Sequence, residues 1–93
     1  MAVMMRSEMQ SVQAEQIRPF IAQANEQMKT FTGFIAQASG PIPGGYQVTE
    51  VWETQEAHER WLREVIGPMA AQQLGLTQAP IAQYFPLDVF LTR

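Results

Sequence analysis

The order of predicted elements in this 93-residue chain is β-α-β-β-α-β, which predicts an α+β fold of the ferredoxin-like type. Three observations lead to that order: segments of strand-like alternation, two apolar stripes with helical spacing, and a glycine-rich turn between the middle strands. Such a fold places two helices on one face of a four-stranded antiparallel sheet. The length predicts a single domain, residues 1–93.

The first strand is predicted over residues 1–9, MAVMMRSEM, whose methionines we interpret as pliable packing rather than metal or redox ligands. Ser11 is the predicted N-cap of the first helix, and Gly33 the residue that ends it. Pro19 is expected to kink this helix or to mark its true start. The helix carries an apolar stripe at spacings of three and four residues: Ile17, Phe20, Ile21, Ala24, Met28 and Phe31.

Two strands joined by a tight turn are predicted next, over residues 34–39 and 46–53. The connecting segment 40–45, GPIPGG, has prolines that fix φ and two glycines that permit the positive φ of hairpin turns. A glycine-rich loop can also bind phosphate. Here it joins strand to strand without a following helix or a lysine, so we interpret it as structural.

A second helix is predicted to begin at Thr54, an N-cap, and to be interrupted at Gly67-Pro68 before a short segment that ends near Gln73. After a loop, residues 81–91 form the last predicted strand, which Pro86 restricts to an edge, bulged or broken position. The helix has a charged outer face, and its opposite arc is apolar: Ala57, Trp61, Leu62, Val65, Ile66 and Met69.

Composition narrows the classes of function. The net charge is −3 with only six basic residues, which argues against a nucleic-acid partner. No apolar run approaches the ~18 residues of a membrane span, and the apolar start of the chain is too short for a signal peptide. The chain has no cysteine. A cytoplasmic location is therefore expected.

A chain of this size has a thin core, which close packing or a partner subunit would reinforce. We expect the helices to cover one face of the sheet and to leave Met4, Tyr46, Val48 and Trp52 on the other. That second face would be too apolar for open water, and an exposed apolar patch usually marks an association site. The sequence therefore predicts a homodimer in which two sheets pack face to face.

Several short segments together resemble small dimeric α/β barrel proteins related to the antibiotic biosynthesis monooxygenases. The segments that carry the resemblance are MAVMMRSEM, AEQI, GFIAQASGP, GGYQVTEVWETQEAHERW, GPM and YFPLDVF. The family pattern corresponds here to Ala38–Pro41 (with Ser39 inserted), Gly45–Tyr46, Val51–Thr54, Glu56–Ala57, Gly67–Pro68 and Phe85–Pro86. The resemblance implies a homodimer whose two sheets enclose a barrel-like cavity. It implies no reaction, because many members of this group have no assigned one. Relatives that cyclise polyketides use histidine and tyrosine, and others use Trp, Tyr and Arg around an aromatic substrate, but their catalytic positions are not carried over to this chain.

His58 and Glu50 are the candidate catalytic residues. His58 lies in the apolar arc of the second helix, where burial and the positive helix end favour a neutral ring that can act as a general base. A packed core histidine is the alternative. Glu50 shares a strand face with aromatic residues and needs a partner when buried, for which Arg6 is the natural candidate. An interface ion pair or a rim position is the alternative for Glu50.

Tyr46, Trp52 and Arg6 are the candidate ligand-binding residues, although large aromatic residues often only fill a core. One histidine and no cysteine make a metal site improbable, and no cofactor is expected. The sequence thus supports two functions. The first is binding of a hydrophobic or aromatic small molecule in the barrel cavity, as in a cofactor-independent monooxygenase or a polyketide cyclase. The second is a non-enzymatic structural or stress-related interaction dimer with a self-filled interior.

Overall fold

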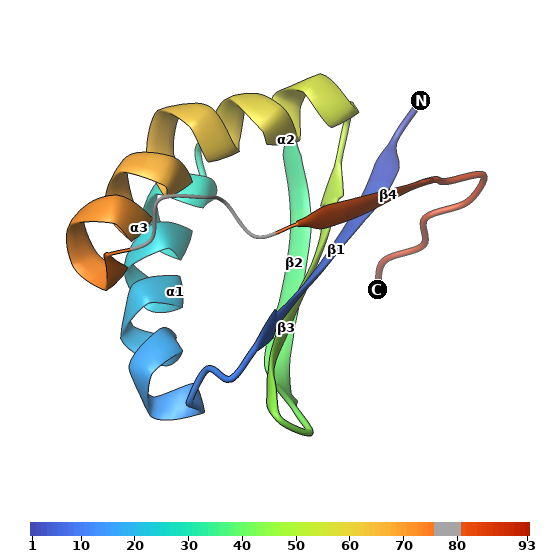
Figure 1. The fold of residues 1–93 in the computed structure, drawn as a ribbon. Coiled ribbons are helices and arrows are strands. Elements are labelled where there is room, and N and C mark those ends of the chain that lie inside the picture. Colours follow the sequence, from blue (N-terminus) through green and yellow to red (C-terminus); the bar gives the residue numbers. More distant parts are fainter. Residues whose placement is uncertain (76–80) are drawn as a thin grey trace.

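The computed structural model describes residues 1–75 and 81–93, and it has the α+β, ferredoxin-like arrangement that the sequence predicts. Four strands form one open antiparallel sheet in the order β2-β3-β1-β4. All described helical segments lie on one face of this sheet, and the C-terminal segment lies on the side of the other face (Figure 1). The strands are β1 (Val3–Gln10), β2 (Phe34–Ile42), β3 (Gly45–Trp52) and β4 (Ala82–Pro86).

Helix α1 (Ala14–Met28) begins later than predicted. Ser11 adopts a left-handed conformation with φ 60° and donates its backbone N–H to Gly44, at 2.7 Å. It therefore belongs to the turn after β1, and Gln13 stands at the N-cap without a side-chain hydrogen bond. The helix continues through Pro19, whose side of the helix is exposed, so the missing N–H costs no buried hydrogen bond. It ends at Met28 rather than at Gly33, whose φ of 94° instead leads the chain into β2.

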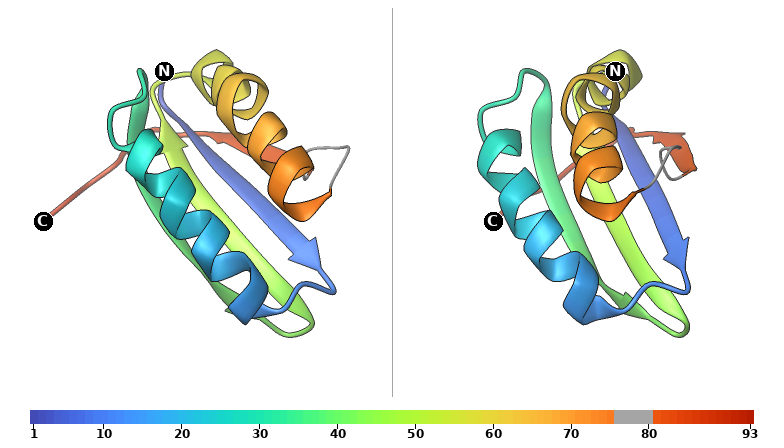
Figure 2. Two further views of the ribbon diagram at one scale, coloured as in Figure 1. Left: turned by 90° about the vertical axis from the view of Figure 1, so that its left-hand side faces the viewer. Right: turned by 60° about the vertical axis from the view of Figure 1, so that its left-hand side comes forward.

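The second helical region changes form before Gly67-Pro68, as predicted, and Pro68 stands in the first turn of its last segment, although the chain stays helical throughout. It consists of α2 (Gln55–Trp61), a π-helical turn η1 (Leu62–Ile66) and α3 (Gly67–Leu74). Proline has no N–H for the α-helical ladder, and the wider π turn, closed by Gly67 N–H to Leu62 C=O, absorbs this change. The predicted cap is confirmed, because Thr54 Oγ1 accepts from Ala57 N–H at 3.1 Å. Figure 2 shows α1 and this region side by side over the sheet.

The last strand is the edge strand that Pro86 predicts, but it is shorter than residues 81–91. Pairing with β1 ends at Pro86, and Leu87 donates one further backbone bond to Ala2. The remaining C-terminal segment runs out on the side away from the helices (Figures 1 and 2). The loop predicted ahead of this strand falls mainly on residues 76–80, outside the described residues.

The core lies between the sheet and the helices, and the strand residues that face it differ from those predicted. Tyr46, Val48 and Trp52 are buried in the same cluster as the apolar side chains of α1, so they face the helices rather than the open side. Met5 lies with them, and Met4 therefore points the other way. The prediction assigned Met4, Tyr46, Val48 and Trp52 to one outer face without knowing the register between strands, and of these only Met4 lies there.

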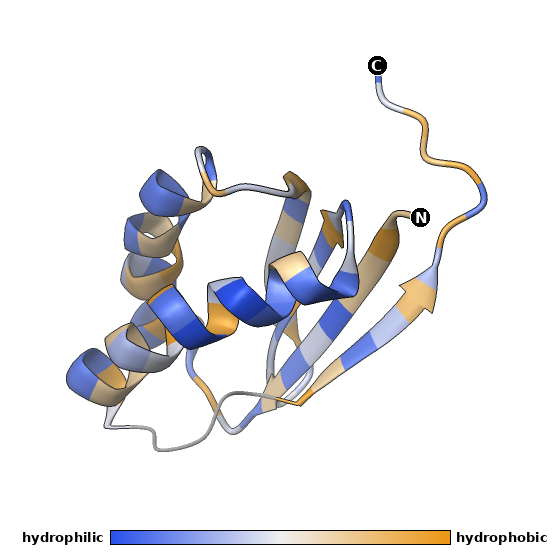
Figure 3. Cartoon of the chain, turned by 90° about the horizontal axis from the view of Figure 1, so that it is seen from above, coloured by the Kyte–Doolittle hydropathy of each residue, from blue (hydrophilic) through white to orange (hydrophobic). Residues whose placement is uncertain are grey.

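The open face has a narrower apolar surface than expected. One row of side chains across all four strands is apolar, and it consists of Ala36, Val51, Met4 and Phe85. The next row contains Ala38, Thr49, Arg6 and Gln83 and is mostly polar. The segment after β4 adds hydrophobic residues on this side, as its colouring in Figure 3 shows, with Val89, Phe90 and Leu91 exposed. None of the described helices is long and apolar enough to cross a membrane.

Candidate functional site

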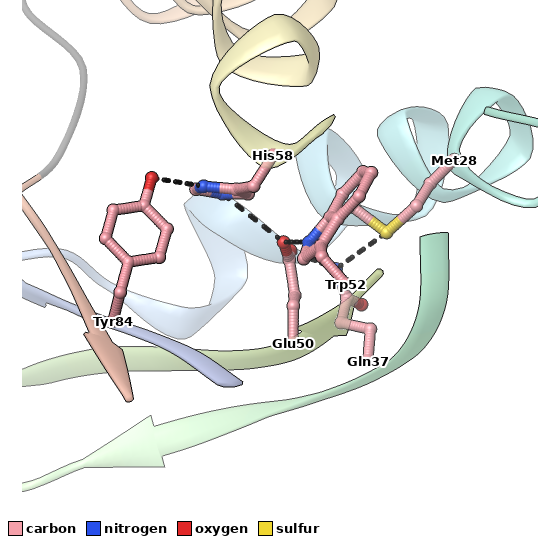
Figure 4. Close-up of polar contacts among 6 residues, drawn as sticks. All are labelled: Met28, Gln37, Glu50, Trp52, His58 and Tyr84. Carbon is pink, nitrogen blue, oxygen red and sulfur yellow. Dashed lines mark hydrogen bonds and ion pairs between the residues drawn. The ribbon is translucent and has the colours of Figure 1, made fainter. Parts of the chain in front are cut away.

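The candidate site is a row of side chains on the helix-covered face of the sheet, with His58 above it. The register aligns Gln37 on β2 with Glu50 on β3, Glu50 with Met5 on β1, and Met5 with Tyr84 on β4. His58 comes from the first turns of α2, whose start Thr54 caps. Its ring reaches Glu50 on one side and Tyr84 on the other, across the strand that carries Met5 (Figure 4).

Glu50 is the most heavily bonded side chain of the site. Its carboxylate is only 4% exposed, and it accepts from Trp52 Nε1–H at 2.9 Å and from Gln37 Nε2–H at 3.0 Å. His58 Nε2 lies 3.5 Å from the carboxylate oxygen that Trp52 also contacts. Burial raises the pKa of Glu50, against the lowering effect of the hydrogen bonds from Trp52 and Gln37. The carboxylate is therefore a stronger base than an exposed glutamate.

His58 is neutral at physiological pH. Burial lowers the pKa of its imidazole to about 4, and the nearby charge of Glu59 opposes this shift only in part. A neutral ring carries one N–H. When Glu50 is ionised it can only accept, so this N–H lies on Nε2, and Nδ1 accepts from the Tyr84 hydroxyl at 2.7 Å. Burial also raises the pKa of Tyr84, with the charges of Glu59 and Glu50 adding to the effect. The tyrosine therefore stays protonated and donates.

Trp52 fixes one side of the site by packing. Its side chain is fully buried, and it makes edge-on contacts with Phe31, Phe34 and the His58 ring at centroid distances of 5.5 to 6.1 Å. Such contacts restrict rotation of the indole and hold its N–H toward Glu50. Trp52 is thus a wall and a hydrogen-bond donor in this conformation.

A partly open cavity of about 70 Å³ adjoins the site. Apolar side chains of α1, η1 and α3 form most of its wall, and Met5, Met9 and Val48 form its floor on the sheet. Its polar boundary consists of Ser7, Gln37, Glu50 and His58. A single carboxylate and a neutral imidazole next to an apolar space are suited to moving a proton to or from a hydrophobic molecule. Within residues 1–75 and 81–93, no group of three or more histidine or acidic side chains is placed to hold a metal ion.

The structure brings together only some of the residues predicted as a site. His58, Glu50 and Trp52 meet directly. Tyr46 shares their sheet face but pairs with Met9, and it does not line the cavity. Arg6 is not the partner of Glu50, because it points to the open face and lies 3.6 Å from Glu8. β1 is adjacent to β3 as expected, but Met5 rather than Arg6 occupies the position beside Glu50.

Sequence reasoning missed Gln37, Tyr84 and Ser7. Gln37 and Tyr84 lie on the two edge strands, and only the strand register shows that both align with Glu50 through the central strands. The alternation of Ala82, Tyr84 and Pro86 places Tyr84 on one face, although it cannot say which face the helices cover. For Ser7 as well, alternation along the strand does not say whether its face is the one that the helices cover. Its burial follows from its place between Val48 and Ala82 in the sheet.

No protein-family model and no curated protein sequence matches the chain. Solved structures do, at the level of the fold. A cofactor-independent oxygenase, SnoaB, from Streptomyces nogalater aligns with a TM-score of 0.69 at 14% identity, over 99% of this chain and 97% of that chain. A proposed antibiotic biosynthesis monooxygenase from Bordetella bronchiseptica gives a TM-score of 0.73 at 14% identity, over 95% and 98%. A heme-degrading protein from Mycobacterium tuberculosis gives 0.67 at 18% identity, over 99% and 100%.

These likenesses confirm the structural resemblance to antibiotic biosynthesis monooxygenase-like proteins that the sequence segments indicated. At identities of 14 to 18% they concern the course of the backbone alone. The oxygenase and the heme-degrading protein share this backbone, so one fold supports different chemistries. The site itself must therefore carry any argument about the reaction.

Proposed function

We propose that the protein binds a hydrophobic or aromatic small molecule between its sheet and helices and removes a proton from it. Glu50 is the base in this proposal. The observation that carries it is a buried carboxylate with a raised pKa, bordering an apolar cavity and held by Trp52, Gln37 and His58. A general base works best when its pKa lies close to the operating pH, and burial moves a carboxylate in that direction.

The Glu50 carboxylate can accept a substrate proton while it keeps its existing contacts. Trp52, Gln37 and His58 contact the carboxylate, which has about four lone-pair sites in all. One site is left for a substrate proton. His58 acts as a positioning residue, because its Nε2–H points at Glu50 while Tyr84 holds the other ring nitrogen.

The substrate class follows from the wall of the cavity and from the strength of the base. An apolar molecule with a weakly acidic C–H or O–H, such as a ketone with a benzylic α-CH₂ group or a phenol, suits both. The resulting enolate or phenolate is the first intermediate of two reactions that fit the fold resemblance. In a cofactor-independent monooxygenase, the enolate or phenolate carbon would add to dioxygen to form a hydroperoxide, which loses water to leave a new C=O group. In a polyketide cyclase, the enolate carbon would attack a second carbonyl group to form a C–C bond, and the resulting alkoxide would take up the proton from Glu50.

The test is hydrogen–deuterium exchange at the acidic CH₂ of 2-tetralone in D₂O, followed by NMR, with the buffer rate subtracted. The protein should accelerate exchange, and Glu50→Gln should reduce the acceleration by at least ~100-fold, the usual contribution of a general base. His58→Gln should reduce it less, because the base remains. Glu56→Gln is the matched control, since Glu56 is an exposed carboxylate in the first turn of α2. Equal rates for wild type and Glu50→Gln would exclude Glu50 as the base.

The size of the cavity supports a second candidate, a non-enzymatic interaction protein with a self-filled interior. The space of about 70 Å³ is well below the ~300–1,000 Å³ of drug-sized ligand sites. In this case neither 2-tetralone nor larger tricyclic ketones would raise the melting temperature or quench tryptophan fluorescence. Saturable binding by wild type would exclude the self-filled interior.

We further propose that the protein is a homodimer joined through the open face of the sheet. The support is the apolar row of Ala36, Val51, Met4 and Phe85, together with the exposed hydrophobic residues after β4. The row lies near one end of the sheet and is followed by the mostly polar row of Ala38, Thr49, Arg6 and Gln83, and an apolar patch beside polar residues is typical of a protein interface.

A further inference from the structure

Ser7 is a buried polar residue without a partner. Its side chain lies on β1 with 8% of the residue exposed, and it lines the cavity beside Glu50 and His58. Within the described residues, its hydroxyl has no hydrogen-bond partner. Buried hydroxyls are usually paired, because an unpaired one loses its hydrogen bonds to water and gains none in return.

The sheet offers no packing reason for a serine at this position. Ser7 stands between Val48 on β3 and Ala82 on β4, both apolar and both lining the same cavity. An alanine would occupy this place without an unpaired polar atom. The free protein therefore carries a destabilising group in the wall of its cavity, and such groups are typical of functional positions.

Ser7 is also well placed relative to the proposed base. Glu50 pairs directly with Met5, and Ser7 is two residues further along the same face of β1. Diagonal neighbours of this kind lie roughly 7–8 Å apart at Cα. Both side chains border the cavity. When a molecule presents an acidic hydrogen to Glu50, another of its atoms, close to that hydrogen, can therefore lie near the Ser7 hydroxyl.

We propose that Ser7 donates a hydrogen bond to an oxygen of the ligand and thereby selects phenols, or ketones that contain an aromatic ring, over hydrocarbons of the same shape. This assignment rests on the proposed function. For a ketone, the proton passes from the α-carbon to the Glu50 carboxylate, and the electron pair of the broken C–H bond forms the C=C bond of an enolate. The negative charge collects on the former carbonyl oxygen, which the Ser7 O–H holds. Return of a proton or deuteron from Glu50 to the carbon restores the ketone, so the cycle needs no oxidant.

The experiment compares two ligands, 2-tetralone and its hydrocarbon counterpart tetralin, with wild type and with Ser7→Ala. Binding is measured by titration calorimetry, and exchange of 2-tetralone by NMR. Ser7→Ala should weaken binding of 2-tetralone about tenfold and slow its exchange, while the affinity for tetralin stays within about twofold. The free Ser7→Ala protein should melt at the same temperature as wild type or higher, because an unpaired hydroxyl has been removed. Ser39→Ala is the matched control, since Ser39 is level with Val48 on β2 and does not line the cavity.

The outcomes separate this assignment from the proposed function. Equal losses for both ligands, or no loss for 2-tetralone, would show that Ser7 does not contact the ligand oxygen. A lower melting temperature of free Ser7→Ala would identify a structural serine and overturn the assignment as well. In both cases Glu50-dependent exchange by wild type would leave the proposed function standing. Failure of wild type to bind either compound would overturn both.

Discussion

His58 bridges two strands that are not neighbours in the sheet. Glu50 lies on β3 and Tyr84 on β4, with β1 between them, and the imidazole contacts both. The neutral ring expected from burial agrees with its pKa of about 4. The residue of β1 that lies beside Glu50 could not be predicted in the same way. Arg6 and Met5 are adjacent in the sequence, and only the pairing of Met5 with Glu50 decides which of them lies on the helix side.

The lowered pKa of His58 makes stability depend on pH. The unfolded imidazole titrates near its ordinary value of 6.5, whereas the folded one does so at about 4. As the pH falls from 6.5 toward 4, the unfolded chain takes up a proton that the folded chain does not, so the free energy of unfolding decreases. The stabilisation is present above pH 6.5 and is lost on the acid side. Glu50, with its raised pKa, has the opposite dependence and gains stability on protonation.

The contribution of His58 is measured as a difference between two proteins. Urea unfolding of wild type and of His58→Gln at pH 7 and pH 4.5 isolates it, because all other groups, Glu50 included, titrate in both. Wild type should lose more free energy of unfolding between the two pH values, by about 2 kcal/mol or more. Identical losses would mean that the pKa of His58 is the same in the folded protein as in the unfolded chain.

At the scale of elements, local chemistry predicted positions that depend on near neighbours. The Thr54 cap, the positive φ of Gly44 and the edge position of the last strand all follow from a few adjacent residues, although the turn is shorter than residues 40–45 because β2 continues to Ile42 and β3 begins at Gly45. The misplaced boundaries depend on distant contacts. Ser11 does not cap α1 because its backbone is bonded to Gly44 of the hairpin, over 30 residues away in sequence. The π turn before Pro68, by contrast, is a local response to the missing N–H of that proline.

The hairpin provides a prediction about Gly45. A Cβ atom there would meet the backbone carbonyl oxygen of Met9, which cannot move without breaking the β1–β3 ladder. Gly45→Ala should destabilise the protein by about 1–3 kcal/mol, the usual range for overpacking. The melting temperature should fall by roughly 4–8 °C for each kcal/mol. Gly40→Ala is the control, because a Cβ atom at Gly40 meets nothing within 4 Å. Equal melting temperatures for the two variants would contradict the close approach at Gly45.

At the scale of the whole molecule, the sequence predicted the layers correctly but exchanged the contents of the two sheet faces. Period-two alternation divides the residues of each strand into two sets, and nothing within a strand says which set the helices cover. Tyr46, Glu50 and Trp52 were expected between two copies of the protein, and they lie under the helices instead. The site consequently lies within one chain, and the surface proposed for self-association is separate from it.

The proposed dimer predicts a response to a charge on the open face. Phe85 is 42% exposed and lies in the apolar row, directly across from Met4. Phe85→Asp should shift the mass measured by light scattering at micromolar concentration from a dimer toward a monomer. Ala71→Glu adds the same charge on an exposed position of α3 and should leave the mass unchanged. A well-folded wild-type monomer under these conditions would rule out the dimer.

Strand β4 has a consequence for the relation between these two surfaces. Tyr84 bonds to His58 in the interior, and Phe85, the next residue, lies on the opposite side of the same strand. Strand β4 has five residues and is paired on one side only, so a movement of the strand displaces the interior residue Tyr84 and the outer residue Phe85 together. A molecule that displaces His58 from Tyr84 would remove one of its attachments. If a second copy of the protein packs on Phe85, ligand binding in the interior and dimerisation are linked by one coupling free energy. Ligand binding then changes the dimerisation constant by the same factor as dimerisation changes the ligand-binding constant.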